Sequence, residues 1–352
     1  MRLRGPTLLC MLALTVAKCD PVPVSAHPAR YAAPPPVASV DPASGERSVT
    51  FRVLIYNVAG LPWPIGLHRG EALRHIGDAL RGLRASDAEP DVVLLQEAFT
   101  KEGREIGARA GYAYSADGPG RADAPHNPQP QDAFRAGRSF WKGEKLGKMV
   151  GSGLVALSDY PIVGTARQAF GRHDCAGFDC LASKGVLLVR IQVPGIPEPV
   201  DIVTTHLNSK RSSGVPESRS LQAYRRQFDE IASFLKTHRS PDHPLVLGGD
   251  LNVRGEPARY DYAAARLGHP FVHASCGTSV VCDIGRQPDV RRPGIGTEDL
   301  QTFDSGGGVR IEPVSMRLLF QQPVDGRPLS DHAAELVVYR LSWHPARLAA
   351  AN

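Results

Sequence analysis

Polar residues with the chemistry of a catalytic site occur at five places, each at the end or the start of a strand-like stretch. In chain order they are Tyr56-Asn57, Gln96-Glu97, Thr205-His206-Leu207-Asn208, Asp250-Leu251-Asn252 and Ser330-Asp331-His332. In sheet enzymes, residues at the ends of several strands converge on one crevice even when they are far apart in sequence. We therefore expect these five clusters to form a single site.

Oxygen atoms dominate the side chains of this expected site. Glu97, Asp250, Asn57 and Asn252 all offer carboxylate or amide oxygens. Such ligands suit a hard cation, Mg²⁺ or Mn²⁺, and not zinc. The sequence therefore predicts a metal site built from oxygen ligands.

Two histidines add proton chemistry to the oxygen ligands. Asp331 directly precedes His332, and a carboxylate partner favours the imidazolium and fixes the orientation of the ring. A histidine held in this way can take a proton from water. His206 is a donor that can stabilise charge developing on a transferred group. A metal, a base and an anion-stabilising donor together predict hydrolysis of a phosphoester.

Hydrophobic patterning predicts alternating strands and helices that would position these residues. An apolar, β-branched run predicts a strand where residues 51–57 lie, and leucines and an isoleucine at three- and four-residue steps predict a helix after it. Further strands are expected at residues 91–97, 153–158, 185–193, 200–205, 245–251 and 335–341. A long amphipathic helix is expected at residues 217–238. Residues 118–147 are polar and rich in Gly, Pro and Arg, and we expect a surface excursion near the substrate.

Composition and charge place limits on the class of protein. The chain has 352 residues, of which 42% are hydrophobic and 22% charged, a normal globular mixture that excludes disorder throughout. The formal net charge of +5 is too small for a strongly basic coat. No apolar run reaches about 18 residues, so we expect no transmembrane segment. We expect a monomer with one catalytic domain at residues 49–345.

The first residues have the features of a targeting signal. Arg2 and Arg4 precede a short apolar run, and Ala26 ends a Val-Ser-Ala sequence typical of a cleavage site. We expect residues 1–26 to be a signal peptide, residues 27–48 to be a Pro-rich linker, and the mature protein to be secreted or periplasmic. Lipid attachment at Cys19 is the alternative, although Lys18 before it fits such a site poorly.

Export changes the interpretation of the cysteines. Outside the signal region the chain has two close pairs, Cys175 with Cys180 and Cys276 with Cys282. In an oxidising compartment two short-loop disulfides are the simplest interpretation, although four cysteines allow three pairings. A zinc site is the rival, but neither pair has the usual two-residue spacing.

The ordered motifs resemble the endonuclease/exonuclease/phosphatase superfamily, the metal-dependent phosphodiesterases of deoxyribonuclease I type. The motifs are YNVAGLPWP, VVLLQEAF, VTTHLNS, LGGDLNV and LSDHAAEL. Their detailed form is most similar to the neutral and bacterial sphingomyelinases. The resemblance implies a fold of class α/β (α+β), a four-layer α/β/β/α sandwich of two packed mixed sheets flanked by helices.

The resemblance also implies roles for individual residues. Glu97 would be the principal Mg²⁺ ligand with Asn57 close by, and Asp250 and Asn252 would orient water and phosphate. His206 would stabilise the transition state, and His332, positioned by Asp331, would be the general base. Asn208 and Lys184 are candidates for substrate binding. The family's further aspartate is uncertain here, because Asp299 and Asp304 both lie in the corresponding stretch.

The substrate is open between two classes. A sphingomyelinase acting at a membrane surface fits the motif variants, the export signal and the aromatic residues Trp63, Phe140 and Trp141. A secreted nuclease fits the same catalytic residues, and basic residues of the excursion would then contact phosphates. These basic residues are Arg121, Arg135, Arg138, Lys142, Lys145 and Lys148. A binding protein without catalysis would require loss of the metal and base residues, which are present.

Overall fold

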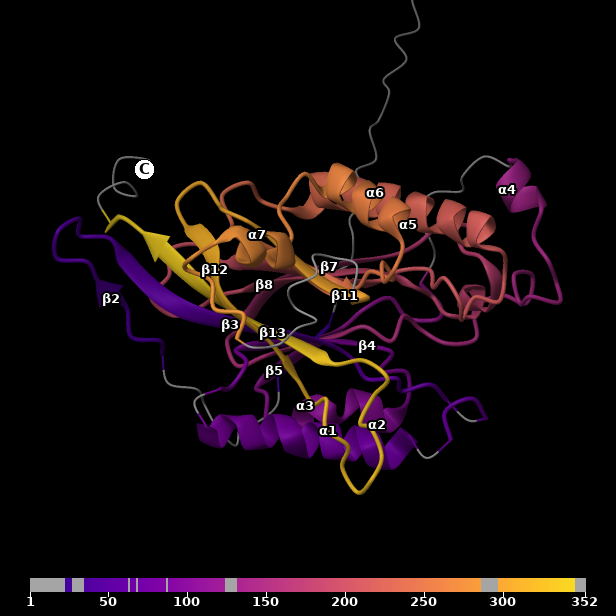
Figure 1. Ribbon diagram of the computed structural model, residues 1–352, viewed down its shortest axis with the longest axis horizontal. Helices are drawn as coiled ribbons and strands as arrows, with labels where there is room; N and C mark the ends of the chain where they lie inside the picture. The colour runs from indigo at the N-terminus through magenta and orange to yellow at the C-terminus, as the bar shows by residue number, and fades with distance from the viewer. Residues whose placement is uncertain are drawn as a thin grey trace, which may run out of the picture.

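Two β-sheets pack face to face and helices cover their outer sides, as Figure 1 shows. This computed structural model describes residues 23–26, 35–62, 64–67, 69–86, 88–123, 132–285 and 297–345. The predicted four-layer α/β/β/α sandwich is therefore confirmed. Of the expected features, the apolar core of the signal, Cys10, Cys19 and Trp63 lie outside the described residues.

The first sheet has the order β1-β5-β6-β4-β3-β13-β12, with β2 paired to β3. Its strands are β1 Val24–Ala26, β2 Ser39–Val40, β3 Arg47–Asn57, β4 Val92–Gln96, β5 Tyr114–Asp117, β6 Val155–Ser158, β12 Arg310–Leu319 and β13 Ala334–Trp343. β3 and β4 are parallel, and their ends pair Asn57 with Gln96. Glu97 therefore follows directly beside Asn57.

The second sheet has the order β11-β10-β9-β8-β7. Its strands are β7 Ile162–Ala169, β8 Gly185–Ile191, β9 Val200–His206, β10 Leu245–Asp250 and β11 Asp299–Asp304. At one edge Asp250 pairs with His206 of β9 on one side and with Asp299 of β11 on the other. The backbone register alone therefore places three polar residues in a row.

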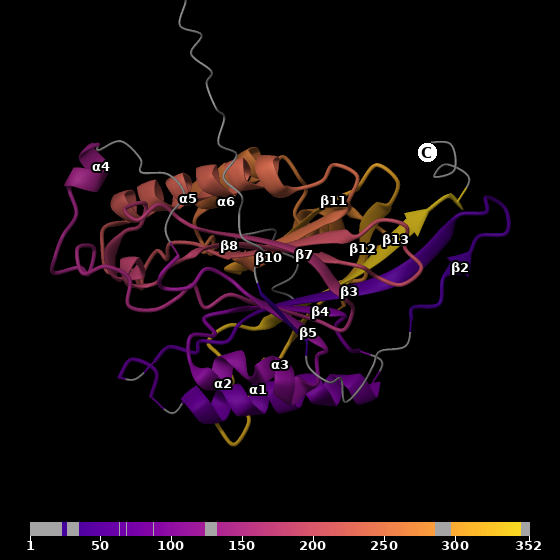
Figure 2. The same cartoon turned by 180° about the vertical axis from the view of Figure 1, so that it is seen from behind.

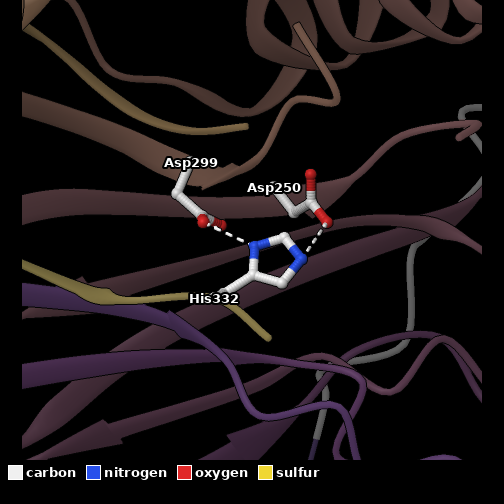
Figure 3. Close-up of side chains that lie close together, drawn as sticks. All are labelled: Asp250, Asp299 and His332. Atoms are coloured by element: carbon white, nitrogen blue, oxygen red, sulfur yellow. Dashed lines mark hydrogen bonds and ion pairs between the residues drawn. The ribbon is translucent and has the colours of Figure 1, made fainter. Parts of the chain in front are cut away.

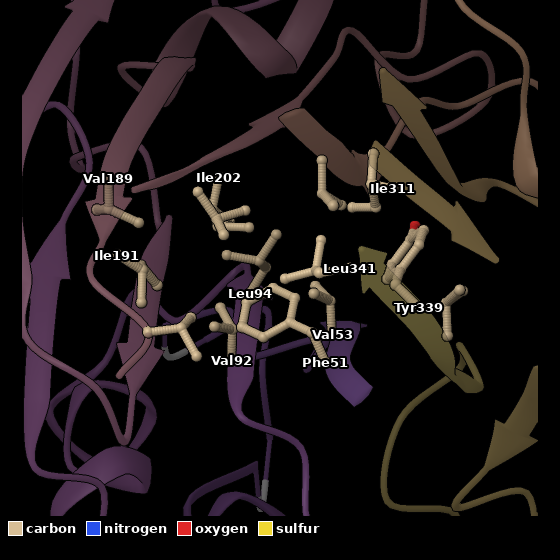
Figure 4. Packing of buried hydrophobic residues seen from close by; sticks show 14 of the residues in the cluster. Phe51, Val53, Val92, Leu94, Val189, Ile191, Ile202, Ile311, Tyr339 and Leu341 are labelled. Carbon is tan, nitrogen blue, oxygen red and sulfur yellow. The ribbon is translucent and has the colours of Figure 1, made fainter. Parts of the chain in front are cut away.

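Apolar side chains from both sheets fill the space between them (Figure 4). Phe51 and Val53 of β3 and Leu94 of β4 face Val189 of β8 and Ile202 of β9, and all are at most 1% exposed. Burying each such side chain contributes about 1.5–3 kcal/mol. This core holds the two sheet edges at a fixed separation, and the catalytic residues lie along those edges.

Helices with an apolar stripe cover each outer face. The helices are α1 Arg69–Leu83, α2 Lys101–Arg104, α3 Ile106–Ala110, α4 Ala133–Ala136, α5 Glu217–His238, α6 Pro257–Leu267 and α7 Val272–Thr278, with short 3₁₀ turns at Arg84–Ser86 and Gly177–Leu181. Leu73, Ile76 and Leu80 of α1 pack on the first sheet. Phe228 and Ile231 of α5 pack on the second. The residues 217–238 expected to be helical are therefore the residues of α5.

Several elements were not expected from the sequence. β5, β7, β11, β12 and α6 were missed, because their short or mixed patterns lack a clear period. Val24–Ala26 at the end of the expected signal pairs with β5, and Ser39–Val40 in the expected linker pairs with β3. The linker is therefore not wholly unpacked, because these two residues extend the edge of a sheet. The division at residues 26 and 48 remains a prediction.

Both expected disulfides are present. Cys175 bonds to Cys180 and Cys276 bonds to Cys282. The first fixes the loop between β7 and β8, beside the catalytic edge, and the second closes the loop after α7. In the described part of the chain no helix combines the length and the apolar character needed to cross a membrane.

Candidate active site

The acidic residues of the site meet around the amide of Asn57. Its Nδ2 donates to Oε1 of Glu97 at 3.2 Å and to Oδ2 of Asp250 at 2.9 Å. Its Oδ1 accepts a hydrogen bond from the backbone N of Ala59 at 3.0 Å. Asn57 is therefore beside Glu97 as expected, but its nitrogen faces the carboxylates because Ala59 holds its oxygen. In this arrangement a cation would contact the carboxylate oxygens and not the Asn57 amide oxygen.

Two site residues stand in a strained backbone conformation. Glu97 has φ 58° and Asn252 has φ 51°, in the left-handed region that few side chains adopt. Glu97 turns the chain at the end of β4, where Ala98 N donates to the carbonyl of Gly153 at 2.9 Å. Such strain costs about 1–3 kcal/mol per residue and persists where the surrounding structure enforces it. Here the turn directs the Glu97 side chain toward Asn57.

Asp250 and Asn252 are joined by a local hydrogen bond. The backbone N of Asn252 donates to Oδ1 of Asp250 at 3.0 Å, and Nδ2 of Asn252 donates to the carbonyl of Leu207 at 3.1 Å. Burial raises the pKa of Asp250 to about 7, and the negative charge of Asp299 adds to this shift, while His332 opposes it. Asp250 is therefore a carboxyl group that gains or loses a proton near neutral pH.

His332 lies between two aspartates, as Figure 3 shows. Its Nδ1 is 2.7 Å from Oδ2 of Asp299, and its Nε2 is 3.9 Å from Oδ2 of Asp250. Burial lowers the pKa of His332, but the carboxylates of Asp299, Asp250 and Asp331 outweigh it and raise the pKa to about 11. The ring is therefore an imidazolium at neutral pH in the protein without a bound cation.

The expectation that Asp331 orients His332 is wrong. Asp331 is exposed, and the ring donates its Nδ1 hydrogen bond to Asp299. The reason is the sheet register, which places Asp299 opposite Asp250, whereas Asp331 lies in the irregular segment before β13. Asp304, the rival candidate, is at the other end of β11 and pairs with Arg239. Asp299 therefore holds the position that the sequence left uncertain.

His206 and Lys184 form a buried pair of nitrogens. Nζ of Lys184 lies 3.1 Å from Nε2 of His206, donates to the carbonyl of Leu207 at 2.8 Å, and pairs with Oδ1 of Asp179 at 2.5 Å. Burial and then the charge of Lys184 hold the pKa of His206 well below its usual range. His206 is thus neutral, and Lys184 supplies the positive charge. Lys184 is 5% exposed and not a solvated surface lysine.

Asn208, expected to contact substrate, is instead fully engaged by the protein. Its Oδ1 accepts from Ala176 N at 2.8 Å and its Nδ2 donates to the carbonyl of Ser209 at 3.1 Å. The residue is 0% exposed. Asn208 therefore joins the loop after β9 to the loop that carries the first disulfide.

The residues present fit a hard divalent cation. The half-buried Glu97 and the buried Asp250 share one amide donor, and desolvation raises the pKa of each carboxyl group. In the described part of the chain, no Lys or Arg forms an ion pair with Glu97, and Nε2 of the neutral His206 lies 4.0 Å from its Oε1. Asp250, Asp299 and His332 also lie within 4.8 Å of one another. Asp299 is already hydrogen-bonded to Nδ1 of His332, so Glu97 and Asp250 are the carboxyl groups that could hold a cation.

Asp179 and Arg259 support the site and were not found from the sequence, whereas Ser330 was expected there as part of the fifth cluster. Asp179 pairs with Lys184, and Ser330 Oγ donates to the carbonyl of Asn57 at 2.6 Å. Arg259 is 0% exposed and donates to the carbonyls of Asn208 and Asn252. An arginine within the apolar stripe of α6 was the available signal for Arg259. The sequence held no signal for Asp179, because its partner is determined by loop folding.

The basic excursion is only partly a solvated loop. Arg135 is buried and its Nη2 donates to both carboxylate oxygens of Asp174 at 2.7 and 2.8 Å. Arg138 contacts the ring of His173. These two arginines fix α4 to the loop after β7, so they are not available for phosphate groups. The lysines of the excursion carry no such pairing to carboxylates among the described residues.

The two-sheet sandwich, the buried carboxyl groups and the Asp299–His332 pair define a hydrolase of phosphate esters. The chain belongs to the Endonuclease/Exonuclease/phosphatase family, whose sequence profile matches residues 54–333. The family assignment agrees with the motifs at the five strand ends.

Relatives within this family include sphingomyelinases. A sphingomyelinase of Mycobacterium tuberculosis is 23% identical over 303 residues, which cover 82% of this chain and 52% of the relative. The chain thus spans about half the length of that protein. Sphingomyelinase C from Streptomyces griseocarneus has a similar fold, with a TM-score of 0.55 and 22% identity over 82% of this chain and 99% of that one. A mutant beta toxin from Staphylococcus aureus with bound magnesium ions has a TM-score of 0.59 and 17% identity, and the match covers 82% of this chain and 99% of that one.

Proposed function

We propose that this protein is a secreted, Mg²⁺-dependent sphingomyelinase that hydrolyses sphingomyelin to ceramide and phosphocholine. The observation that carries the catalytic part is the alignment of Asp299, His332 and Asp250 beside Glu97. The similarity to sphingomyelinases supports the lipid substrate, and the two disulfides support an oxidising compartment.

The geometry suits attack of water on phosphorus. The 3.9 Å between His332 Nε2 and Asp250 Oδ2 is too long for a direct hydrogen bond, so a water molecule can contact both atoms. Asp299 holds the ring. A cation held by Glu97 and Asp250 would lower the pKa of His332, and Nε2 of the neutral ring would then take the proton as the water oxygen bonds to phosphorus. The bond between phosphorus and the ceramide oxygen then breaks, that oxygen takes up a proton from solvent water, and Nε2 returns its own proton to solvent.

The charge that develops on the phosphoryl group is met by the other site residues. Lys184 supplies a buried positive charge next to the neutral His206. Mg²⁺ or Mn²⁺ bound by Glu97 and Asp250 would neutralise charge on the phosphoryl oxygens. These groups are fixed by β4, β8, β9 and β10 before substrate arrives, which is the condition for strong electrostatic stabilisation.

An exposed apolar surface favours a lipid over a nucleic acid. We call it the apolar rim, and it consists of Phe140, Trp141, Leu146, Met149 and Phe178, each between 48% and 85% exposed. Buried Glu144 anchors it by accepting from Ser139 N and Gly177 N. Side chains of this kind enter the boundary between lipid headgroups and chains. Binding of polynucleotides depends on Lys and Arg side chains that contact phosphates and does not require such exposed apolar side chains.

The test compares lipid and DNA as substrates. Purified protein, a His332→Ala variant and a His344→Ala control would be incubated with sphingomyelin liposomes and with DNA, with and without Mg²⁺. We expect phosphocholine release that requires Mg²⁺, is lost in His332→Ala and persists in His344→Ala. DNA cleavage without phosphocholine release would replace the proposal by a secreted nuclease, which uses the same catalytic residues.

A further inference from the structure

A hollow in the surface, separate from the catalytic residues, has three cationic side chains in its wall. Its volume is about 270 Å³. The residues that line it are Arg121, Asp123, Lys148, Ala169, Phe170, Arg172 and Ser183. Ala169, Phe170 and Ser183 are buried and form the floor, while Arg121 and Arg172 are exposed. We call this hollow the basic pocket.

The positive charge of the basic pocket is not neutralised by its own acid. Asp123 is engaged elsewhere, since its Oδ2 lies 3.0 Å from Nε of Arg167 and accepts from Gly120 N at 2.9 Å. Within the described ranges, none of the three pocket cations forms an ion pair with a carboxylate. Arg121 Nε donates to the carbonyl of Lys148 at 2.9 Å, which holds these two side chains on one wall. Burial lowers the pKa of Lys148 to about 8, although the charges of Asp179 and Glu230 oppose this shift, and its Nζ donates to Sγ of Cys175 at 4.0 Å. Such a pocket fits an anion.

The strand order gives the distance from the basic pocket to the catalytic centre. β9 ends at His206, β8 begins at Gly185 beside it, and β7 ends at Ala169 on the floor of the pocket. Neighbouring strands are about 5 Å apart, so two spacings place the pocket about 10 Å from His206. Ser183 of the floor precedes Lys184, whose Nζ contacts His206. A ligand in the basic pocket is therefore a neighbour of the group undergoing reaction.

The apolar rim adjoins the basic pocket through consecutive residues. Lys148 lines the pocket and Met149 belongs to the rim. Figure 2 shows α4 and the loops beside it at one end of the sandwich, away from the C-terminus. A cationic hollow next to exposed aromatic side chains matches the two parts of a lipid surface, the charged headgroups and the apolar chains.

We propose that the basic pocket binds the phosphate of an anionic phospholipid that lies beside the substrate in the membrane. This inference rests on the proposed lipid substrate. In the proposed reaction the phosphate of sphingomyelin lies at the catalytic centre, and its choline end is a cation that does not suit three further cations, so the ligand of the basic pocket is a second lipid. Anionic lipid would then hold the enzyme at the surface on which its substrate lies.

The test measures vesicle binding without hydrolysis. The full protein in EDTA would be sedimented with phosphatidylcholine vesicles that contain or lack phosphatidic acid. Variants Lys148→Gln and Arg172→Gln would be compared with Lys236→Gln, which removes an exposed cation of α5 outside the pocket. Each pocket cation contributes about fivefold in affinity for an anionic surface. We expect phosphatidic acid to tighten binding, and each pocket variant to lose about fivefold of that gain while Lys236→Gln loses less.

The outcomes separate this inference from the proposed function. If the protein hydrolyses sphingomyelin but phosphatidic acid does not change its binding to vesicles, the proposed role of the basic pocket is wrong and the enzyme assignment stands. Equal losses in all three variants would also overturn it, because general surface charge would then be the cause. If the pocket variants weaken binding to vesicles but the protein does not hydrolyse sphingomyelin, the basic pocket binds anionic lipid and sphingomyelin is not the substrate. If the pocket variants weaken binding of a DNA oligonucleotide and not of vesicles, the ligand is a nucleic acid and the lipid assignment fails. Thermal unfolding of each variant confirms that it is folded.

Discussion

Oδ2 of Asp299 lies 2.7 Å from Nδ1 of His332, although 33 positions separate the two residues in sequence. β11 begins at Asp299 and pairs it with Asp250 at the end of β10, while His332 arrives from the other sheet just before β13. The hydrogen bond therefore joins the two sheets across the site. It fixes the ring so that Nε2 faces the carboxylates of Asp250, at 3.9 Å, and Glu298, at 3.7 Å.

Replacing Asp299 by Asn should reduce kcat by on the order of 10²-fold or more, because the ring loses the acceptor that holds it and favours its charged form. Asp331→Asn is the matched control, since Asp331 is exposed and forms no hydrogen bond to the ring among the described contacts. Its kcat should change little. Steady-state kinetics over a range of pH would check both, and an Asp331→Asn loss as large as that of Asp299→Asn would contradict the assignment.

The pKa of His332 in the protein without metal should be near 11, because three carboxylates outweigh the effect of burial. NMR titration of the ring in EDTA would measure it, and Asp299→Asn should lower it. Added Mg²⁺ should also lower it, since a cation beside Asp250 disfavours the imidazolium. Activity with Mg²⁺ should then rise with pH through this lowered pKa. A ring that titrates near 6.5 in EDTA would show that the pairing with the carboxylates is absent.

Metal binding should depend on Glu97. Mg²⁺ at 100 times its Kd raises the stability of a folded protein by about 2.7 kcal/mol, which appears as a higher Tm. Glu97→Gln should lose most of this shift, and EDTA should abolish activity. Glu105→Gln is the control, because Glu105 is an exposed residue paired with Lys101 at 3.6 Å. A Tm that Mg²⁺ raises equally in both variants would place the metal elsewhere.

Glu230 should make the fold less stable as the pH rises toward neutral. Burial raises its pKa to about 7, although Gly171 N donates to both of its carboxylate oxygens. The folded state therefore binds this proton more tightly than the unfolded chain, whose pKa is 4.5. The stabilisation is complete below pH 4.5 and is lost as the pH rises through about 7. Glu230→Gln should be more stable than wild type at pH 8 by about 1–2 kcal/mol in urea unfolding. Parallel pH dependence in the two proteins would refute this role.

The polar residues at the strand ends were predictable because each follows an apolar run that can only be a buried strand. Asn57, Glu97, His206 and Asp250 were found in this way, and the structure brings all four together. The partner of His332 was not predictable, because adjacency in sequence indicated Asp331. Only the register of β10 with β11 places Asp299 beside His332. The residues of β11 have no hydrophobic pattern that predicts a strand. A pairing register depends on contacts distant in sequence, which local patterns do not contain.

Glu97 and Asn252 both have a left-handed backbone, a conformation that lowers the stability of the folded protein. Glycine adopts this conformation at no steric cost, so protein stability alone would favour glycine at both positions. Selection or engineering for heat resistance, applied without selection for activity, should therefore accept Gly at residue 97 and produce a robust but inactive sandwich. A thermostable enzyme has to gain its stability at positions away from these two turns.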